Sequence, residues 1–413
     1  MKKILLPLCA AVACNVENTT PDTGGVGVAG AGGCSPGISV VLSDYASTQV
    51  ALSTLEGQTL SRSFISTGSA KTDGLSFALS GDVVLPSSRP ASGRVVLVDR
   101  FGTNVLTWLD PATARVLGQL AVGTGFDSNP SDYLELDDQF AFVSRYGQNP
   151  EPGRQPFDIG GDLLLVDSRA QEIVGSLPFE ATEDLPPRPS GMMRLGDEIL
   201  VSLVRNARDF STTGDSELAG VSVSTRRLDF RMRYEGLKHC GRPALSPSGD
   251  VLAVACTGAL DIRGVVADVS QSALLLLDAR ELPPRELRRF SAAELGNQPI
   301  QSSATFARDA LLLLKTQTST VGTENNRWLA LDLESGKVTT LLEASPDAQG
   351  KGRGVLYGGM SCSPGCSEVC LLADADRGAL QRVRFDPLGA PELLPPIVVD
   401  AKSGLPPRDI VER

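Results

Sequence analysis

Histidine is almost absent from this sequence of 413 residues, which contains only His239. A Ser-His-Asp triad would have to use that residue, and no Gly-x-Ser-x-Gly nucleophile elbow occurs. The sequence also lacks a Cys-x-x-Cys-His haem motif, a P-loop and a Gly-x-Gly-x-x-Gly turn after a strand. We therefore predict no catalytic residues and no cofactor, and we interpret His239 as a structural or exposed side chain.

Basic runs are also absent. Lys and Arg number 38 against 49 Asp and Glu, so the net charge is -11. An acidic chain repels phosphate backbones, which argues against a nucleic-acid partner. Outside residues 4–13, no apolar run approaches the roughly 20 residues that span a bilayer. We therefore expect the body of the chain to be soluble.

The N-terminus has the pattern of an export signal. Two lysines precede the short apolar run 4–13, which ends in Ala-Val-Ala directly before Cys14. This ending resembles a bacterial lipobox, so we predict a signal peptide at residues 1–13 and a lipid on Cys14. The alternative is an ordinary signal peptide cut near Ala13, which leaves Cys14 as a thiol.

Residues 14–36 are rich in glycine and poor in core-forming side chains. Such a segment cannot bury a core, so we expect a flexible tether between the lipid and a folded domain. Asn15, rather than aspartate, follows the cysteine, which favours the outer membrane by resemblance to enteric sorting. These features predict an exported lipoprotein at the outer membrane or facing the periplasm, which contacts the membrane through its lipid alone.

One hairpin pattern recurs seven times along the rest of the chain. Each copy has two alternating apolar strands around a turn, and the residues before the turns lie 53 to 58 positions apart. These landmarks are Thr54, Asp110, Asp167, Thr225, Asp278, Asp332 and Asp386. A second hairpin interleaves with the first, so each repeat supplies four strands. Four-stranded repeats of this length predict an all-β chain, a seven-bladed β-propeller over residues 37–413.

The second hairpin shows where the ring closes. Its turns are expected at Gly81-Asp82, Asp137-Asp138, Gly196-Asp197, Gly249-Asp250, Arg308-Asp309 and Gly365-Cys366, which is one fewer than the repeats. The first repeat begins at Ile38 without an innermost strand. We predict that residues 406–412 supply that strand and close the ring, so that no sheet edge is left open. The alternative, a β-helix, normally has shorter coils than this period.

Two repeats resemble a known family. Residues 109–123, 129–130 and 140–145 resemble the YVTN-type β-propeller repeat, with Phe-Val-Ser-Arg at 142–145 in place of the signature tetrad. Residues 245–254 match the inner hairpin of the same family. The resemblance implies a propeller outside the cytoplasm. It implies little about activity, because members of the family do not share one.

Six cysteines follow Cys14 in the sequence. Cys240 and Cys256 are equidistant from an inner turn, as are Cys362 and Cys370, so each pair should face across adjacent strands and form a disulfide. We expect Cys34 to form a disulfide with Cys366, which would join the segment before the first strand to the last repeat across the ring closure. A metal site at residues 362, 366 and 370 is the alternative, although zinc sites more often use two-residue gaps.

Long loops identify a candidate binding face. In a propeller, the loops between second and third strands share one face with the connections between blades, and here they span 145–161, 205–220, 257–272 and 316–326. The candidate residues on this face are Arg145, Arg154, Asp158, Arg188, Arg205, Arg208, His239 and Arg242. Converging arginines could hold a carboxylate or phosphate, and the alternative is a solvated surface of ion pairs. Calcium could bind within residues 158–162 or 127–138, although neither has EF-hand spacing. We predict no other metal site.

Two classes of function fit these features. The tether, the rigid ring and the lack of catalytic motifs predict a monomeric binding or scaffold module of the cell envelope for a protein or a small ligand. The alternative is a propeller hydrolase or lactonase with a metal in the central channel. That enzyme would need three or four acids, Asn or His on different inner strands, whereas the inner strands here are mostly apolar or small.

Overall fold

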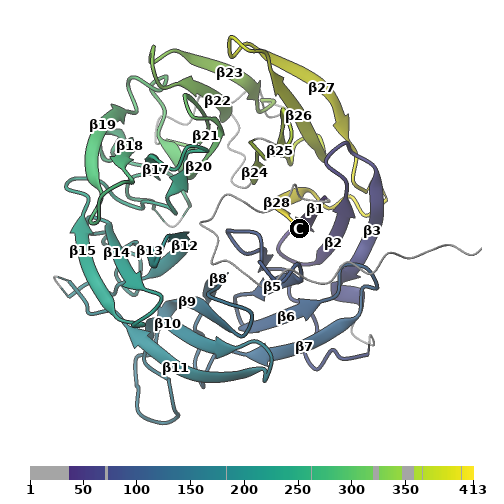
Figure 1. Cartoon of the computed structure of the whole chain (residues 1–413), viewed down its shortest axis with the longest axis vertical. Coiled ribbons are helices and arrows are strands. Elements are labelled where there is room, and N and C mark those ends of the chain that lie inside the picture. Colours follow the sequence, from purple (N-terminus) through teal and green to yellow (C-terminus); the bar gives the residue numbers. More distant parts are fainter. Residues whose placement is uncertain are drawn as a thin grey trace, which may run out of the picture.

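The chain folds into a ring of β-sheets. The computed structural model describes residues 37–413 apart from 70–72, 183, 262, 320–324, 347–357, 365 and 401. Within this part, seven four-stranded antiparallel sheets are arranged as blades around a central axis (Figure 1). The predicted seven-bladed propeller is therefore confirmed. The predicted signal peptide, Cys14 and the tether lie outside the described residues.

The strands follow one order in each blade, from the axis outwards. Blade one contains β28 (Pro407–Glu412), β1 (Ile38–Ser43), β2 (Thr48–Ser53) and β3 (Thr59–Ser66). Blade two contains β4 (Val83–Val84), β5 (Val95–Asp99), β6 (Val105–Leu109) and β7 (Val116–Ala121). Blade three contains β8 (Pro130–Glu135), β9 (Phe140–Gln148), β10 (Gly160–Asp167) and β11 (Glu172–Pro178).

The other four blades repeat this order. Blade four contains β12 (Pro189–Leu195), β13 (Glu198–Leu203), β14 (Glu217–Ser222) and β15 (Leu228–Arg233). Blade five contains β16 (Ala244–Leu245), β17 (Val251–Cys256), β18 (Ala273–Asp278) and β19 (Arg285–Ser291). Blade six contains β20 (Ile300–Arg308), β21 (Leu311–Thr316), β22 (Arg327–Asp332) and β23 (Val338–Glu343). Blade seven contains β24 (Met360–Ser361), β25 (Val369–Asp374), β26 (Ala379–Phe385) and β27 (Pro391–Ile397).

The described helices are two short 3-10 turns, η1 (Thr67–Ser69) and η2 (Val269–Gln271). No helix in this part of the chain is long and apolar enough to cross a membrane.

Burial explains why the middle strands have apolar side chains on both faces. Every residue of β13 and β18 is buried, because each face of these sheets packs against a neighbouring blade. One such cluster joins Leu200 and Leu218 of blade four to Leu252 and Leu275 of blade five. The outermost strands face solvent on one side, so β19 is largely exposed and charged. The continuous apolar runs of the sequence are therefore strands buried on both sides.

The turns match the repeat pattern with one correction. All seven landmark residues lie at the end of a third strand or in the turn that follows it, and five of the six predicted inner turns lie between first and second strands. The sixth prediction, Gly81-Asp82, is wrong, because this dipeptide precedes the two-residue strand β4 instead of following it. The second strand of that blade is β5, after a wide proline-containing connection, residues 85–94. A tight-turn pattern cannot reveal so short an inner strand.

Ring closure occurs as predicted. β28 pairs antiparallel with β1, from Ile38 opposite Glu412 to Leu42 opposite Pro407. Arg408 donates to Asp82 of the next blade (Nη2 to Oδ1, 2.9 Å), and Ile410 is buried in the core. The two ends of the described chain therefore belong to one sheet, which leaves no open edge beside the first blade.

Two of the three predicted disulfides are confirmed. Cys240 bonds Cys256, and Cys362 bonds Cys370. Cys366 is also disulfide-bonded, but its predicted partner Cys34 lies outside the described residues, so that pairing stays a prediction. The alternative metal site at residues 362, 366 and 370 is wrong, because all three sulfurs are in disulfides.

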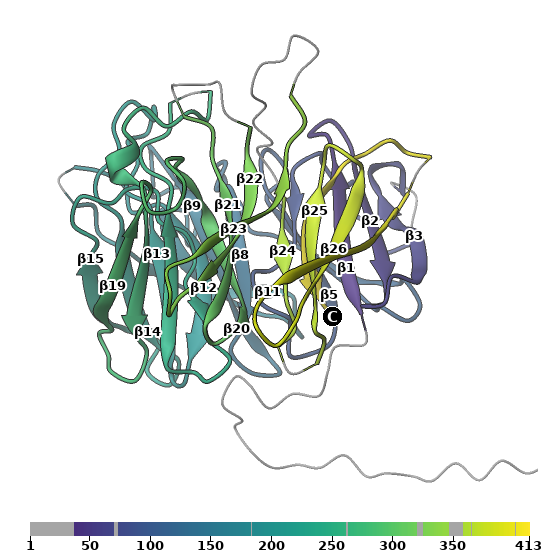
Figure 2. The ribbon, with the colours of Figure 1, turned by 90° about the horizontal axis from the view of Figure 1, so that it is seen from above.

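The two faces of the ring differ. Loops between second and third strands and the connections between blades form one face, which we call the long-loop face. The turns between first and second strands and between third and fourth strands form the other, the short-loop face. Figure 2 shows the ring from the side, with the long-loop face at the top. Gly37, where the described chain begins, lies on the short-loop side at the start of β1.

Burial of Lys315 makes the stability of the ring pH-dependent. Its side chain at the end of β21 is fully buried, and its Nζ lies 4.5 Å from the Trp328 ring without a hydrogen-bond partner. Burial lowers its pKa from 10.5 to about 7, although the carboxylates of Asp374 and Asp376 act in the opposite direction. Between pH 7 and pH 10.5 the unfolded chain therefore binds more protons at this position than the folded chain. Stability should rise with pH over that window.

We predict that Lys315→Met stabilises the protein by roughly 2–4 kcal/mol at pH 7, because no charge is then desolvated. The gain should shrink as the pH rises towards 10, where the parent lysine is neutral. Denaturant unfolding at both pH values measures this, with the exposed Lys337→Met as a control that should show little change. An equal gain at pH 7 and pH 10 would contradict the buried-amine explanation.

Candidate functional site

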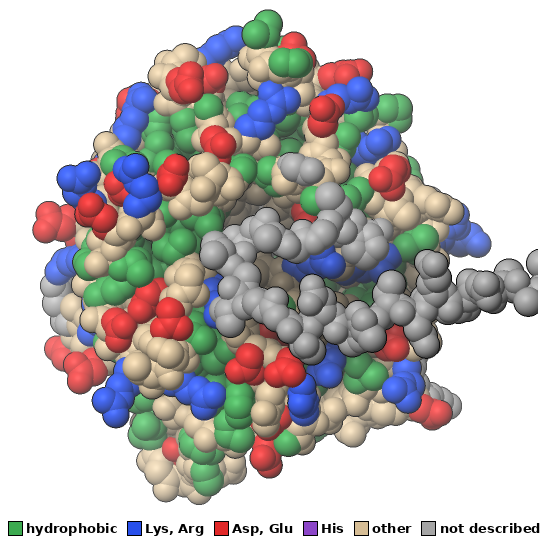
Figure 3. All heavy atoms as spheres, in the orientation of Figure 1, with side chains coloured by type: hydrophobic (Ala, Val, Ile, Leu, Met, Phe, Trp, Pro, Cys, Tyr) green, Lys and Arg blue, Asp and Glu red, His purple; other side chains and the backbone are tan. Residues whose placement is uncertain are grey.

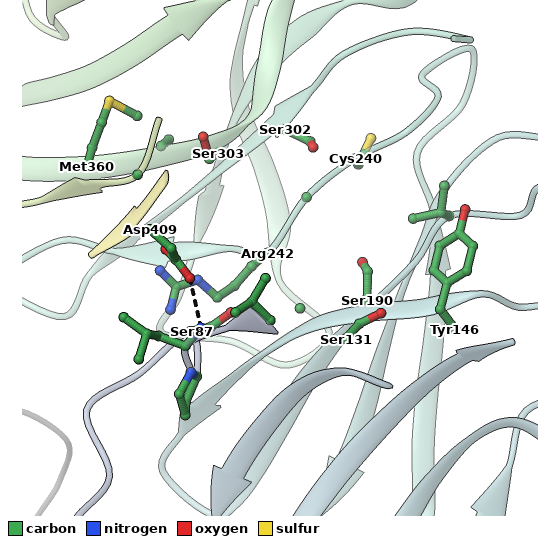
Figure 4. Close-up of a pocket in the computed structure, with 18 of the residues that line it drawn as sticks. Ser87, Ser131, Tyr146, Ser190, Cys240, Arg242, Ser302, Ser303, Met360 and Asp409 are labelled. Atoms are coloured by element: carbon green, nitrogen blue, oxygen red, sulfur yellow. Dashed lines mark hydrogen bonds between the residues drawn. The ribbon is translucent and has the colours of Figure 1, made fainter. Parts of the chain in front are cut away.

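A cavity of about 400 Å³ lies on the axis of the ring at the long-loop side. We call it the long-loop chamber, and Figure 4 shows the side chains that line it. Each blade contributes to its wall: Asp409, Ser87, Ser131, Ser190, Arg242, Ser302 with Ser303, and Met360, in the order of blades one to seven. Tyr146 and His239 complete the upper wall. The chamber therefore exists only when all seven blades are assembled.

A second cavity, the short-loop chamber, has a volume of about 770 Å³. Its wall includes Tyr133, Met193, Phe306 and several prolines. Figure 3 shows the short-loop face, with a hollow near the centre and acidic and basic side chains around it. Arg242 lines both chambers, so its side chain lies where they meet on the axis.

Arg242 has most of its hydrogen-bonding capacity unused. Its only hydrogen bond within the described residues is a long one, from Nη1 to Ser88 Oγ (3.5 Å). No carboxylate oxygen of the described residues lies within 4 Å of its guanidinium. Burial lowers the pKa of Arg242 and the charges of Asp132 and Asp409 raise it, but an arginine stays protonated in proteins. The chamber therefore contains a permanent cation whose donors are available.

Asp409 places a carboxylate beside this cation. It lies on β28 and is partly exposed to the chamber, and Figure 4 shows its side chain near that of Arg242. The backbone N–H of Leu85 donates to its Oδ2, and its own chain neighbour Ile410 donates to its Oδ1, both at 2.9 Å. Burial raises the pKa of Asp409, and these two bonds act in the opposite direction. Lone pairs remain on both oxygens for a ligand.

Asp132 has a structural position behind the wall. Its carboxylate is buried and accepts from the backbone N–H groups of Ser87 (2.7 Å), Tyr133 (2.9 Å) and Met192 (2.7 Å). Those three residues belong to blades two, three and four. Asp132 therefore joins three blades, while burial raises its pKa.

Three of the arginines predicted for a binding face are structural. Arg145 is fully buried and donates twice to the buried Asp162, at 2.7 and 2.6 Å. Arg205 is buried against Glu217 at 2.6 Å. Arg188 donates to three backbone carbonyls and lies about 5 Å from the rings of Tyr146 and Phe210. These cations are committed to the protein itself, so they are not a cluster open to a ligand.

The remaining predicted residues do not form one cluster. Arg154 is exposed and pairs with Glu151, and Arg208 is exposed on the same face. Asp158 accepts three backbone N–H groups of its own loop, which lower its pKa. Of the eight predicted residues, the structure brings only His239 and Arg242 to the long-loop chamber.

His239 is neutral at physiological pH. Burial lowers its pKa to about 4, and its Nδ1 has no hydrogen-bond partner. It is partly buried in the wall of the chamber. The position therefore supplies an uncharged imidazole.

The described residues do not offer an evident metal site. No group of three or more His, Cys, Asp and Glu side chains is arranged there to hold an ion. In the first candidate calcium segment, Asp162 is committed to Arg145 and Asp158 to its loop. In the second, Asp127 accepts from Asn104, and Asp137 accepts from backbone N–H groups of its turn.

Sequence reasoning did not find Asp409 or the serines of the chamber. The signal was nevertheless present, because residues 406–412 were predicted as an innermost strand and such strands line the axis of a propeller. Ser131, Ser190, Ser302 and Ser303 also lie on first strands of their blades. What the pattern could not give is which of two alternating positions faces the axis.

Comparison with solved structures agrees with the fold. A putative 6-phosphogluconolactonase from Bacteroides uniformis is similar at 13% identity and a TM-score of 0.57, covering 91% of this chain and 99% of that one. A periplasmic gluconolactonase from Pseudomonas aeruginosa is similar at 15% identity and a TM-score of 0.54, covering 91% and 98%. A protein from Lactobacillus plantarum is similar at 13% identity and a TM-score of 0.55, with the same coverage. At these identities the likeness shows the propeller fold alone.

No family model matches the chain, and no curated protein matches it. The resemblance to YVTN-type repeats therefore holds for the fold, while membership of that family stays a prediction.

The different roles of the arginines predict different costs of removal. Arg145→Ala should destabilise the protein by about 3–5 kcal/mol, because it leaves Asp162 buried without its counter-ion. Arg242→Ala should cost less than about 1 kcal/mol, because its donors contribute little to the fold. Denaturant unfolding of both variants measures this. Equal destabilisation by the two changes would show that Arg242 is structural and would remove it from the candidate site.

Proposed function

We propose that this chain is a binding protein that holds a small polyhydroxylated molecule in the long-loop chamber. The observation that carries the proposal is that Arg242, with unused donors, and Asp409, with a partly exposed carboxylate, line the same chamber. The other buried arginines of the predicted face are committed to carboxylates or backbone carbonyls.

The chemistry of the wall suits hydroxyl groups. A hydroxyl both donates and accepts, so neighbouring hydroxyls of a polyol can accept from a guanidinium and donate to a carboxylate. Serine side chains in the wall can act in either direction. The volume of about 400 Å³ lies within the usual range for small-molecule sites.

Hydrolysis of a lactone in the same chamber is a second candidate. One structure of the same fold is named a putative 6-phosphogluconolactonase and another a periplasmic gluconolactonase, and the chamber has the groups for a metal-free reaction. Asp409, whose pKa is raised by burial, could take a proton from a water molecule while the water oxygen bonds to the carbonyl carbon of the lactone. Arg242 would stabilise the oxyanion that forms. The ring C–O bond then breaks, and the proton passes to the leaving oxygen.

We predict that neutral saccharides and sugar lactones will raise the melting temperature of the protein, and that Arg242→Ala will weaken this binding at least about tenfold. Arg154→Ala is the matched control, because Arg154 is exposed outside the chamber. Calorimetric titration of the three proteins gives the comparison. Binding that survives Arg242→Ala unchanged would place the ligand elsewhere.

Incubation with a sugar lactone separates the binding protein from the enzyme. A binding protein returns the lactone intact, whereas an enzyme releases acid that a pH-stat records. Retention of that release after treatment with a chelator would favour the metal-free mechanism. Its loss would favour the metal-dependent alternative.

The place of action is also a proposal. We infer from the N-terminal sequence that the chain is exported and anchored by a lipid on Cys14, with the chamber outside the cytoplasm.

We predict that the protein produced in a bacterial host fractionates with membranes, and that Cys14→Ser moves it to the soluble fraction. Cys240→Ser, which removes a disulfide but not the anchor, should leave the folded material in the membrane fraction. Mass spectrometry of the N-terminal peptide identifies the lipid directly. An unmodified Cys14 in the mature parent protein would contradict the anchor.

A further inference from the structure

We propose that Asp409 makes the long-loop chamber select neutral polyhydroxylated ligands and exclude phosphorylated ones. This inference rests on the proposed function, because it concerns the same chamber. It follows from the charges and hydrogen-bond donors around Arg242.

The cationic charge of the chamber is already opposed by carboxylates. The charges of Asp132 and Asp409 both act on Arg242. Arg100, the other arginine of the wall, donates to Asp82 through two hydrogen bonds of 3.2 and 2.9 Å, and that carboxylate also accepts from Arg408. His239 is uncharged. A phosphate dianion entering the chamber would therefore meet the guanidinium of Arg242 together with the carboxylate of Asp409, while the charge of Asp132 acts on that guanidinium from behind the wall.

Four backbone donors beside Arg242 are also occupied. Phosphate sites usually combine a cation with several free N–H groups, often at a helix N-terminus. Here the N–H groups of Leu85 and Ile410 donate to Asp409, and those of Ser87 and Met192 donate to Asp132. The chamber offers carboxylate oxygens where a phosphate site would offer amides.

A neutral polyol meets no such opposition. Its hydroxyls can donate to the free lone pairs of Asp409 and accept from Arg242, and it adds no charge to the chamber. Asp409 is the residue that sets this preference, because its side chain is partly exposed, whereas Asp132 is buried behind the wall.

Replacement of Asp409 by asparagine tests the inference. Asp409→Asn keeps the size of the side chain and removes its negative charge. Inorganic phosphate is the first probe, followed by glucose and glucose 6-phosphate as a matched neutral and phosphorylated pair. Asp400→Asn is the control, because Asp400 lies outside the chamber and accepts from Gln49. Asp409→Ser serves as a second neutral variant if asparagine impairs folding.

We expect the parent to bind glucose at least tenfold more tightly than glucose 6-phosphate, and to be unaffected by inorganic phosphate. In Asp409→Asn the ratio of the affinities for glucose and glucose 6-phosphate should fall about tenfold, and inorganic phosphate should raise the melting temperature. Adding Arg242→Ala should abolish that new effect. Phosphate binding to the parent, or tighter binding of glucose 6-phosphate than of glucose, would overturn the inference.

Failure of the proposed function would look different. If the parent binds no saccharide but Asp409→Asn still gains an Arg242-dependent phosphate effect, the role of the Asp409 charge is supported and the polyol ligand is not. If neither neutral variant gains phosphate binding, the role of Asp409 is wrong whatever the parent binds.

Discussion

The antiparallel pairing of β28 with β1 is the contact on which the rest of the structure depends. It converts a linear series of hairpins into a ring, and it joins the two ends of the described chain in one sheet. The same strand places Asp409 at the axis and Arg408 against Asp82 of the next blade. Ring closure and completion of the chamber are therefore one event, because the acidic residue of the site belongs to the strand that closes the ring.

Burial separates the arginines into two kinds. Burying a guanidinium is costly unless a counter-ion is buried with it, and Arg145 and Arg205 both pair with buried carboxylates. Arg242 has no such partner among the described residues, and its one hydrogen bond to them is 3.5 Å long. Its remaining donors face the axis, where water or a ligand can satisfy them. An arginine that the fold does not use is the physical reason for placing the site at this point of the channel.

The sequence predicted the scaffold well, because the scaffold depends on patterns. The seven regularly spaced residues before the outer turns predicted the number of blades. The inner turns numbered one fewer than the repeats, which predicted that the end of the chain supplies the closing strand. Cysteines equidistant from a turn gave Cys240–Cys256 and Cys362–Cys370. The burial of the candidate side chains was not predicted, because loop length says nothing about where a side chain points. Arg145 and Arg242 are both arginines near loops, and only tertiary packing distinguishes the buried ion pair from the open cation.

This difference explains how propellers can share a ring at about 10–15% identity. Packing between blades constrains the apolar character of the middle strands but not the few residues that each blade turns towards the axis. In this chain those residues include serines, Arg242, Asp409 and Met360, and together they come from all seven blades. Each can change without disturbing the cores between blades. Chemistry in the channel therefore has to be inferred from these positions individually, and similarity of the ring cannot replace that step.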